Sequence, residues 1–334
     1  MSPTSYQAAP PRIIVLRHES FATPHAWRQV PYARKRSCLD LARPAVLPTY
    51  VMAVLVLDFD GTMTDAEQEG AAFVAGYLDD LCTLVGRPAA DPQVLALGET
   101  TAQAITTHPA DYPFLWMGRA VAPATVDPYL RMVPIAHAIF DHFGAFTNAN
   151  DRGRLLGAIL YKYNYAKTQP HFRAGAGELL SALATQKHAV WIVTNSDTEA
   201  VAKKVGLLSH QFPAVASLAT RVRGFARKFD IDDNWAGVPA ELALPGLRRP
   251  VLLRRHTYYD ILATLLEVEN ASFADLVVVG DIFELDLAMP LTAGARVGLV
   301  HSTHTPGYER DFVSSHPRAK LLSGLHEVLP YAFG

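Results

Sequence analysis

The stretch VMAVLVLDFDGTMTD, residues 51–65, decides the fold of this chain. Its aliphatic run from Ala53 to Leu57 has no polar interruption, which is typical of a strand buried on both faces of a sheet. Two carboxylates, Asp58 and Asp60, follow at once, and Gly61 permits a tight turn. The stretch therefore predicts a buried strand that ends in an acidic turn.

Two later stretches repeat this pattern of an aliphatic run followed by small polar residues. AVWIV, residues 189–193, precedes Thr-Asn-Ser, and LVVV, residues 276–279, precedes Gly-Asp. Helical patterns precede both runs, and a fourth strand is expected at 296–300. Strands that alternate with helices predict an α/β fold with a doubly wound parallel sheet.

Ligands bind beyond the carboxyl ends of strands in such sheets, which is where the polar residues of all three stretches lie. Asp58 and Asp60 are two residues apart and so face the same side. Asp58 suits a nucleophile that attacks phosphorus, and Asp60 suits the group that protonates the leaving oxygen. The remaining candidates are Thr194, Asn195 and Ser196 with Gly61 and Thr62 as phosphate or substrate contacts, and Asp281 and Asp286 as magnesium ligands with Asp58.

The ordered set DFDGT, VTNS and GDIFELD resembles the signature motifs of the haloacid dehalogenase superfamily. This resemblance covers residues 52 to about 300. It implies a Rossmann-like core, an aspartyl-phosphate intermediate on Asp58 and a phosphate contact from Thr194. It also implies Mg²⁺ held by Asp58, Asp281 and the main-chain carbonyl of Asp60.

The family also requires a cation at a third motif, for which this sequence offers two candidates. Arg255 begins the helical pattern before the last catalytic strand, where the family usually places this residue, and Arg254 adjoins it. Lys228 is the chemically usual residue, but a long stretch separates it from Asp281. We rank Arg255 slightly ahead of Lys228.

A helical insertion is expected at residues 67–170, between the first two motifs, with the core formed by residues 52–66 and 171–334. Its apolar stripes have helical spacing, and no strand comparable to those of the core is expected there. The stripes are Phe73, Tyr77, Leu81 and Leu84; Ile135, Ile139 and Phe143; and Leu155, Leu156, Ile159 and Tyr163. In the family, an insertion at this position is a cap that closes over the substrate.

Residues 1–51 differ from the rest of the chain, since they hold seven Lys or Arg against two acidic residues. Repeated prolines interrupt any periodic pattern there. We expect either a poorly ordered extension or, as the favoured alternative, an upstream segment before a true start at Met52. A transit peptide is a third interpretation.

The composition favours a protein that acts on a small molecule. The formal net charge of −2 gives no basic field for nucleic acid or an anionic membrane, and two cysteines are too few for a disulfide framework. We expect a cytoplasmic magnesium-dependent phosphatase acting on a small phosphorylated metabolite, with the oligomeric state left open. A sugar phosphomutase of the same superfamily and a non-catalytic phosphate-binding protein are the alternatives.

Overall fold

A computed structural model describes residues 53–334 of this chain. The expectations for residues 1–51, including a start at Met52, lie outside the described residues.

The centre of the fold is a parallel sheet of six strands in the order β10-β9-β8-β1-β4-β5. The four strands expected from the sequence are confirmed as β1 (Val54–Leu57), β4 (Ala189–Val193), β8 (Leu276–Gly280) and β9 (Arg296–Val300). Two short edge strands, β5 (Val222–Arg223) and β10 (Ala319–Leu322), complete the sheet. The chain therefore has the expected α/β fold.

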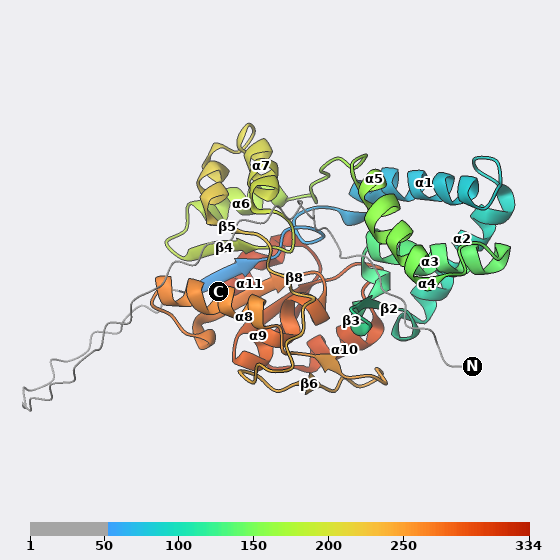
Figure 1. The fold of residues 1–334 in the computed structure, drawn as a ribbon. Coiled ribbons are helices and arrows are strands. Elements are labelled where there is room, and N and C mark those ends of the chain that lie inside the picture. Colours follow the sequence, from blue (N-terminus) through green and yellow to red (C-terminus); the bar gives the residue numbers. More distant parts are fainter. Residues whose placement is uncertain (1–52) are drawn as a thin grey trace, which may run out of the picture.

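Alternate residues of β1 supply the two hydrophobic cores on either face of the sheet. Leu55 and Leu57 pack with α6 (Ala176–Ala184), α7 (Thr198–Ser209) and α11 (Val328–Phe333). Val54 and Val56 pack with α8 (His256–Val268), α9 (Ala288–Ala293) and α10 (Gly307–Ser315). Figure 1 shows helices on both sides of the sheet, so the strand is buried on both faces as its unbroken aliphatic run requires.

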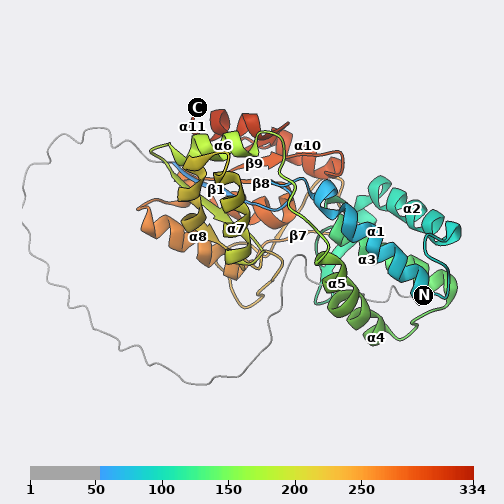
Figure 2. The ribbon, with the colours of Figure 1, turned by 90° about the horizontal axis from the view of Figure 1, so that it is seen from above.

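Residues 66–165, most of the chain between β1 and β4, form a group of helices beside the sheet, which we call the inserted segment (Figures 1 and 2). Its connections run side by side, because Thr64 and Phe172 form an antiparallel bridge. Asp65, Asp91 and Asp127 cap the first turns of its three longest helices. The helices are α1 (Ala66–Leu84), α2 (Pro92–Thr107), α3 (Pro128–Phe143), α4 (Ala149–Arg154) and α5 (Lys162–Tyr165).

An antiparallel hairpin within the inserted segment departs from the expected all-helical pattern. Strands β2 (Pro113–Trp116) and β3 (Arg119–Pro123) are joined by Met117 and Gly118, whose φ angles are 49° and 78°. Two positive φ angles are typical of a tight hairpin turn, but Met-Gly is not among the dipeptides that signal one. The hairpin contacts the core, since Trp116 packs edge-on against Phe229 at 4.5 Å between ring centroids.

The prediction of a third apolar stripe at Leu155, Leu156, Ile159 and Tyr163 is partly wrong, because this part of the chain is not a regular α-helix. Residues Leu155–Tyr161 form a π-helical turn, which shifts the buried side by one residue per turn. Leu156 is buried as expected, whereas Ile159 and Tyr163 are 51% and 62% exposed. Leu160 and Tyr161 take their places in the core.

The chain between β5 and α8 is a long connection that carries a small antiparallel pair, β6 (Glu241–Leu242) and β7 (Val251–Leu252). A π-helical turn, Phe283–Leu287, follows β8, and a 3-10 segment, Pro213–Arg221, precedes β5. Across residues 53–334, no helix combines the length and the apolar character that crossing a membrane would require.

Candidate active site

The carboxyl ends of β1, β4 and β8 bring the three motifs together. The strands are aligned so that Leu57 pairs with Ile192 on one side and with Val279 on the other. The residues that follow them therefore meet at one edge of the sheet. They line a cavity of about 30 Å³ together with two residues of the inserted segment; its lining is Asp58, Asp60, Asp127, Leu130, Thr194, Asn195, Asp281, Ile282, Leu285 and Asp286.

Asp58, Asp281 and Asp286 form a buried acidic cluster. One oxygen from each carboxylate lies within 4.8 Å of the others. Thr62 lies between them, since its hydroxyl is 3.0 Å from Oδ2 of Asp58 and 3.1 Å from Oδ1 of Asp281. Gly61 is required beside this cluster because a Cβ there would lie 2.2 Å from Oδ2 of Asp281, and because its φ is 85°.

Lys228 supplies the cation at this cluster. Its Nζ lies 2.8 Å from Oδ1 of Asp58 and 2.9 Å from Oδ1 of Asp286, and its side chain is 1% exposed. Burial alone would lower the pKa of Lys228, but Asp286 and Asp58 outweigh that effect and raise the pKa above its ordinary value. Lys228 is therefore held in its charged form between the two carboxylates.

Arg255 does not reach the acidic cluster, so the placement reverses the sequence-based ranking of Arg255 ahead of Lys228. Its guanidinium is fully buried and donates to the carbonyl of Lys228 and, at 3.0 Å, to that of Val121 in β3. Burial lowers the pKa of Arg255 to about 10. Arg254 donates to the carbonyl of Asp233 instead. Arg255 thus supports the Lys228 backbone and links it to the inserted segment.

Four features meet at the carboxyl edge of the sheet. They are the acidic pair Asp58 and Asp60, the hydroxyl of Thr194, the Gly-Asp pair at 280–281, and the buried Lys228, which contacts Asp58. This arrangement agrees with the resemblance to the haloacid dehalogenase superfamily that the order of the motifs suggests. The inserted segment lies between the first two of these motifs.

Comparison with solved structures found superfamily hydrolases at low sequence identity. A predicted phosphoglycolate phosphatase from Haemophilus somnus is 16% identical, with 84% of this chain and 98% of that chain covered and a TM-score of 0.46. A superfamily hydrolase of subfamily IA from Geobacter sulfurreducens is 15% identical, with 84% and 96% covered and a TM-score of 0.42. A superfamily hydrolase from Bacillus subtilis, bound to magnesium, is 14% identical, with 84% and 97% covered and a TM-score of 0.42. No protein-family model and no curated protein matches the sequence.

Asp60 faces the same cavity as Asp58 but has its own set of partners. Ser196 donates its hydroxyl to Oδ2 at 2.5 Å, and Thr194 lies 3.4 Å from the same oxygen. Lys204 of α7 approaches Oδ1 at 3.1 Å. The side chain of Asp60 is therefore directed to these groups and is not one of the three carboxylates that could share a metal ion.

The four expected substrate contacts fall into two groups. Asn195 lines the cavity, and its Oδ1 accepts the backbone N–H of Lys228 at 2.7 Å. Gly61, Thr62 and Ser196 instead organise the site from behind, since the Gly61 amide donates to Thr64 and the two hydroxyls contact carboxylates. Their hydrogen bonds fix Asp58 and Asp60 in place.

The acidic cluster has the donor chemistry that Mg²⁺ requires. Hard carboxylate oxygens are its preferred protein ligands. The cluster holds three carboxylates, and the ammonium group of Lys228 contacts two of them, which leaves an excess of negative charge when all are ionised. Burial raises the pKa of Asp286, Lys228 counteracts this, and Asp58 adds to it. A divalent cation would relieve this repulsion, so Asp58, Asp281 and Asp286 fit a magnesium site.

Sequence reasoning missed four residues at the site. Asp127 and Leu130 line the cavity from α3, and Lys204 and Glu69 extend the contacts of Asp60. The Asp-Pro pair that begins α3 signals a helix start, although not its position over the cavity. Nothing in the sequence signals that Lys204 meets a carboxylate 144 positions away.

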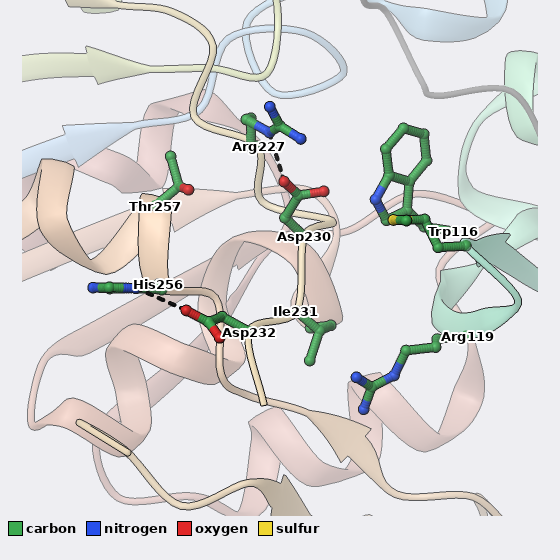
Figure 3. A pocket seen from close by; sticks show the side chains of 9 residues that line it. Trp116, Arg119, Arg227, Asp230, Ile231, Asp232, His256 and Thr257 are labelled. Carbon is green, nitrogen blue, oxygen red and sulfur yellow. Dashed lines mark hydrogen bonds and ion pairs between the residues drawn. The ribbon is translucent and has the colours of Figure 1, made fainter. Parts of the chain in front are cut away.

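A second cavity of about 310 Å³ is lined in part by residues that neighbour Lys228 in the sequence (Figure 3). Lys228 points into the acidic cluster, whereas its neighbours Arg227 and Asp230 line this cavity with Trp116 of the hairpin. Its charged groups are largely paired with one another, since Arg227 contacts Asp230 at 2.6 Å and His256 contacts Asp232 at 3.1 Å. The second cavity therefore shares a loop with the candidate active site but none of its carboxylates.

Proposed function

We propose that this protein is a magnesium-dependent phosphatase that hydrolyses a small phosphorylated metabolite through a phosphoryl group carried on Asp58. The observation that carries the proposal is one cavity lined by Asp58, Asp60, Thr194 and Asp281. Lys228 contacts Asp58, one of the carboxylates that line that cavity. These groups match what covalent phosphoryl transfer needs: a nucleophile, an acid and base, and positive charge near the phosphate.

In the first step, the carboxylate of Asp58 attacks phosphorus, and the bond from phosphorus to the ester oxygen breaks. Asp60 gives its proton to that leaving oxygen. In the second step, Asp60 takes a proton from water while the water oxygen attacks the same phosphorus. The bond to Asp58 breaks, and inorganic phosphate leaves.

Mg²⁺ bound by Asp58, Asp281 and Asp286 would screen the repulsion between the attacking carboxylate and the phosphate. The hydroxyl of Thr194 and the side-chain amide of Asn195 line the cavity where phosphate oxygens would lie. Lys228 keeps Asp58 oriented and contributes positive charge. This division of roles gives Asp58, Asp60, Asp281 and Asp286 of the cavity each a part in the reaction.

We further propose that the inserted segment acts as a cap. Asp127 and Leu130 of α3 line the cavity, which at about 30 Å³ has room for only a few water molecules. A phosphate ester would therefore enter when α3 moves away from the strand ends. The side chains that α3 presents there would select the leaving group.

The test is a screen of phosphate esters with purified protein and Mg²⁺, in which inorganic phosphate is measured. Asp58→Asn should reduce release to below about 0.1% of wild type, because the nucleophile is lost. A chelator should abolish release, and added Mg²⁺ should restore it. Asp79→Asn, an exposed acid on α1, is the matched control and should retain full activity.

The proposal fails if no ester in the screen releases phosphate, or if Asp58→Asn remains active. Isomerisation of a sugar phosphate without net release of phosphate would instead show a phosphomutase. Mg²⁺ should also raise the melting temperature of the wild type and not that of Asp281→Asn, since a ligand of the folded state stabilises it.

A further inference from the structure

Lys204 lies outside the family motifs, yet its ammonium group contacts two buried carboxylates. Nζ is 3.1 Å from Oδ1 of Asp60 and 2.6 Å from Oε1 of Glu69. The side chains of Lys204, Asp60 and Glu69 are 15%, 4% and 3% exposed. Burying charged groups costs free energy unless they pair with one another at close distance. These three side chains are therefore not ordinary surface charges, and their burial requires a structural or functional explanation.

The two oxygens of Asp60 have different partners. Oδ1 faces Lys204, while Oδ2 faces the hydroxyls of Ser196 and Thr194. Contacts on both oxygens fix the plane of a carboxylate as well as its position. Without Lys204, Asp60 would keep its hydroxyl contacts but lose this ion pair with an ammonium group.

Glu69 connects this arrangement to the inserted segment. It lies in the first turn of α1, a short distance along the chain from the first motif. Its second oxygen, Oε2, is buried and makes no hydrogen bond with any residue in the described range 53–334. Lys204 thus provides the charge contact of Glu69 within that range, and it joins α1 to α7 of the core.

We propose that Lys204 is a positioning residue that orients Asp60 toward the leaving oxygen, and that Glu69 holds Lys204 in place when α1 is docked. This inference rests on the proposed function, in which Asp60 transfers the proton. It adds a link from the inserted segment to the proton-transfer group, carried by one lysine. Proton transfer is then most efficient while α1 lies against the core.

The test compares phenyl phosphate, whose leaving group needs a proton, with p-nitrophenyl phosphate, whose leaving group departs readily without one. Lys204→Met should lower kcat/KM for phenyl phosphate by roughly 10- to 100-fold and for p-nitrophenyl phosphate by less than about threefold. Lys203→Met, at the exposed neighbouring position of α7, is the control and should match the wild type with both esters. Glu69→Gln keeps Lys204 and the shape of the side chain, and should show the same selectivity with a smaller loss.

An equal loss with both esters, or no loss with either, would overturn the positioning role. Wild-type behaviour of Glu69→Gln would overturn the link to α1. Glu69→Gln also keeps the inference testable if Lys204→Met does not fold, because it leaves the ion pair between Lys204 and Asp60 intact.

Hydrogen–deuterium exchange separates this inference from the proposed function. If the wild type releases no phosphate from any ester, the function is refuted, and exchange in residues 66–72 still tests the link. Faster exchange there in Lys204→Met than in Lys203→Met supports the link between α1 and α7. Equal exchange in the two variants overturns it.

Discussion

Lys228 reaches the acidic cluster from a loop in which Phe225 and Arg227 have left-handed backbone angles, with φ of 52° and 46°. Such angles are uncommon in residues other than glycine and cost free energy. They turn Phe225 and Arg227 outward while Ala226 and Lys228 are buried. The loop therefore accepts local strain and places one ammonium group between two carboxylates.

Replacing that ammonium group should be severe for activity. Lys228→Met should lower kcat roughly 100- to 1,000-fold, as the loss of one preorganised charge does in other enzymes. Steady-state kinetics with the best ester of the screen measures this. Arg227→Met changes the neighbouring outward-facing charge and should retain activity within about threefold, which separates a specific role of Lys228 from a general effect on the loop. Full activity of Lys228→Met would contradict the role.

The lysine also shows what spacing cannot predict. The residues of DFDGT (58–62) and GDIFELD (280–286) could be predicted one by one, because each motif follows its strand directly. Lys228 is separated from β8 by β6, β7 and α8, and the length of such a connection carries no information about where its side chains point. Its position in the sequence favours Arg255 over Lys228 as the cation of the site. In the structure, Arg255 instead donates a hydrogen bond to the backbone carbonyl of Lys228.

At the scale of elements, the π-helical turn Leu155–Tyr161 changes which residues of the inserted segment are buried. A regular helix would place Leu156 and Ile159 on one side, and periodicity in the sequence gives that answer. The wider turn buries Leu156 and exposes Ile159. A search for apolar residues at a spacing of 3.6 does not detect the wider π-helical turn. The burial of Leu160 in place of Ile159 could therefore not be predicted from the sequence.

The two residues give a direct test of that register. Leu156→Ala should lower the free energy of unfolding by about 2–5 kcal/mol, because it leaves a cavity in the core of the inserted segment. Ile159→Ala should change it by less than about 0.5 kcal/mol. Urea denaturation followed by circular dichroism measures both. Equal losses would show that the helix is regular there.

At the scale of the whole molecule, a second buried group of charges includes Glu284, which lies within the stretch GDIFELD (residues 280–286). Arg249 holds Glu284 with two hydrogen bonds of 2.7 and 2.8 Å, and Glu309 of α10 is fully buried nearby. Burial raises the pKa of Glu309 well above its ordinary value of 4.5, and Glu284 adds to this, while the backbone amides of Glu284 and Phe283 partly offset it. The folded protein therefore favours the protonated form of Glu309.

This raised pKa makes stability depend on pH. The unfolded chain releases the proton near pH 4.5, whereas the folded chain keeps it to higher pH. The contribution of Glu309 is therefore fully present below the ordinary pKa, and it is lost by about 1.4 kcal/mol per pH unit as pH rises toward the folded pKa. Glu309→Gln should remove this slope in urea denaturation, whereas Asp311→Asn, exposed on the same helix, should keep it. An unchanged slope in Glu309→Gln would contradict the assignment.

The sheet and its two covered faces follow from the sequence because each aliphatic run is buried on both sides. The position of the hairpin β2–β3 against the core could not be predicted from the sequence. It depends on a hydrogen bond from Arg255 to the carbonyl of Val121, and these residues are 134 positions apart. Contacts of this kind depend on how distant segments of the chain pack together, which local patterns do not encode.

The hydrogen bond from Arg255 to Val121 has a consequence for how a ligand would gain access. The same guanidinium also donates to the carbonyl of Lys228. Arg255 therefore connects the hairpin of the inserted segment to the loop that carries Lys228. Separating hairpin from core would strip a fully enclosed guanidinium of one acceptor and expose the ring contact of Trp116 with Phe229. A movement of the whole inserted segment away from the core would therefore break both contacts, whereas a movement that leaves the hairpin in place would keep them.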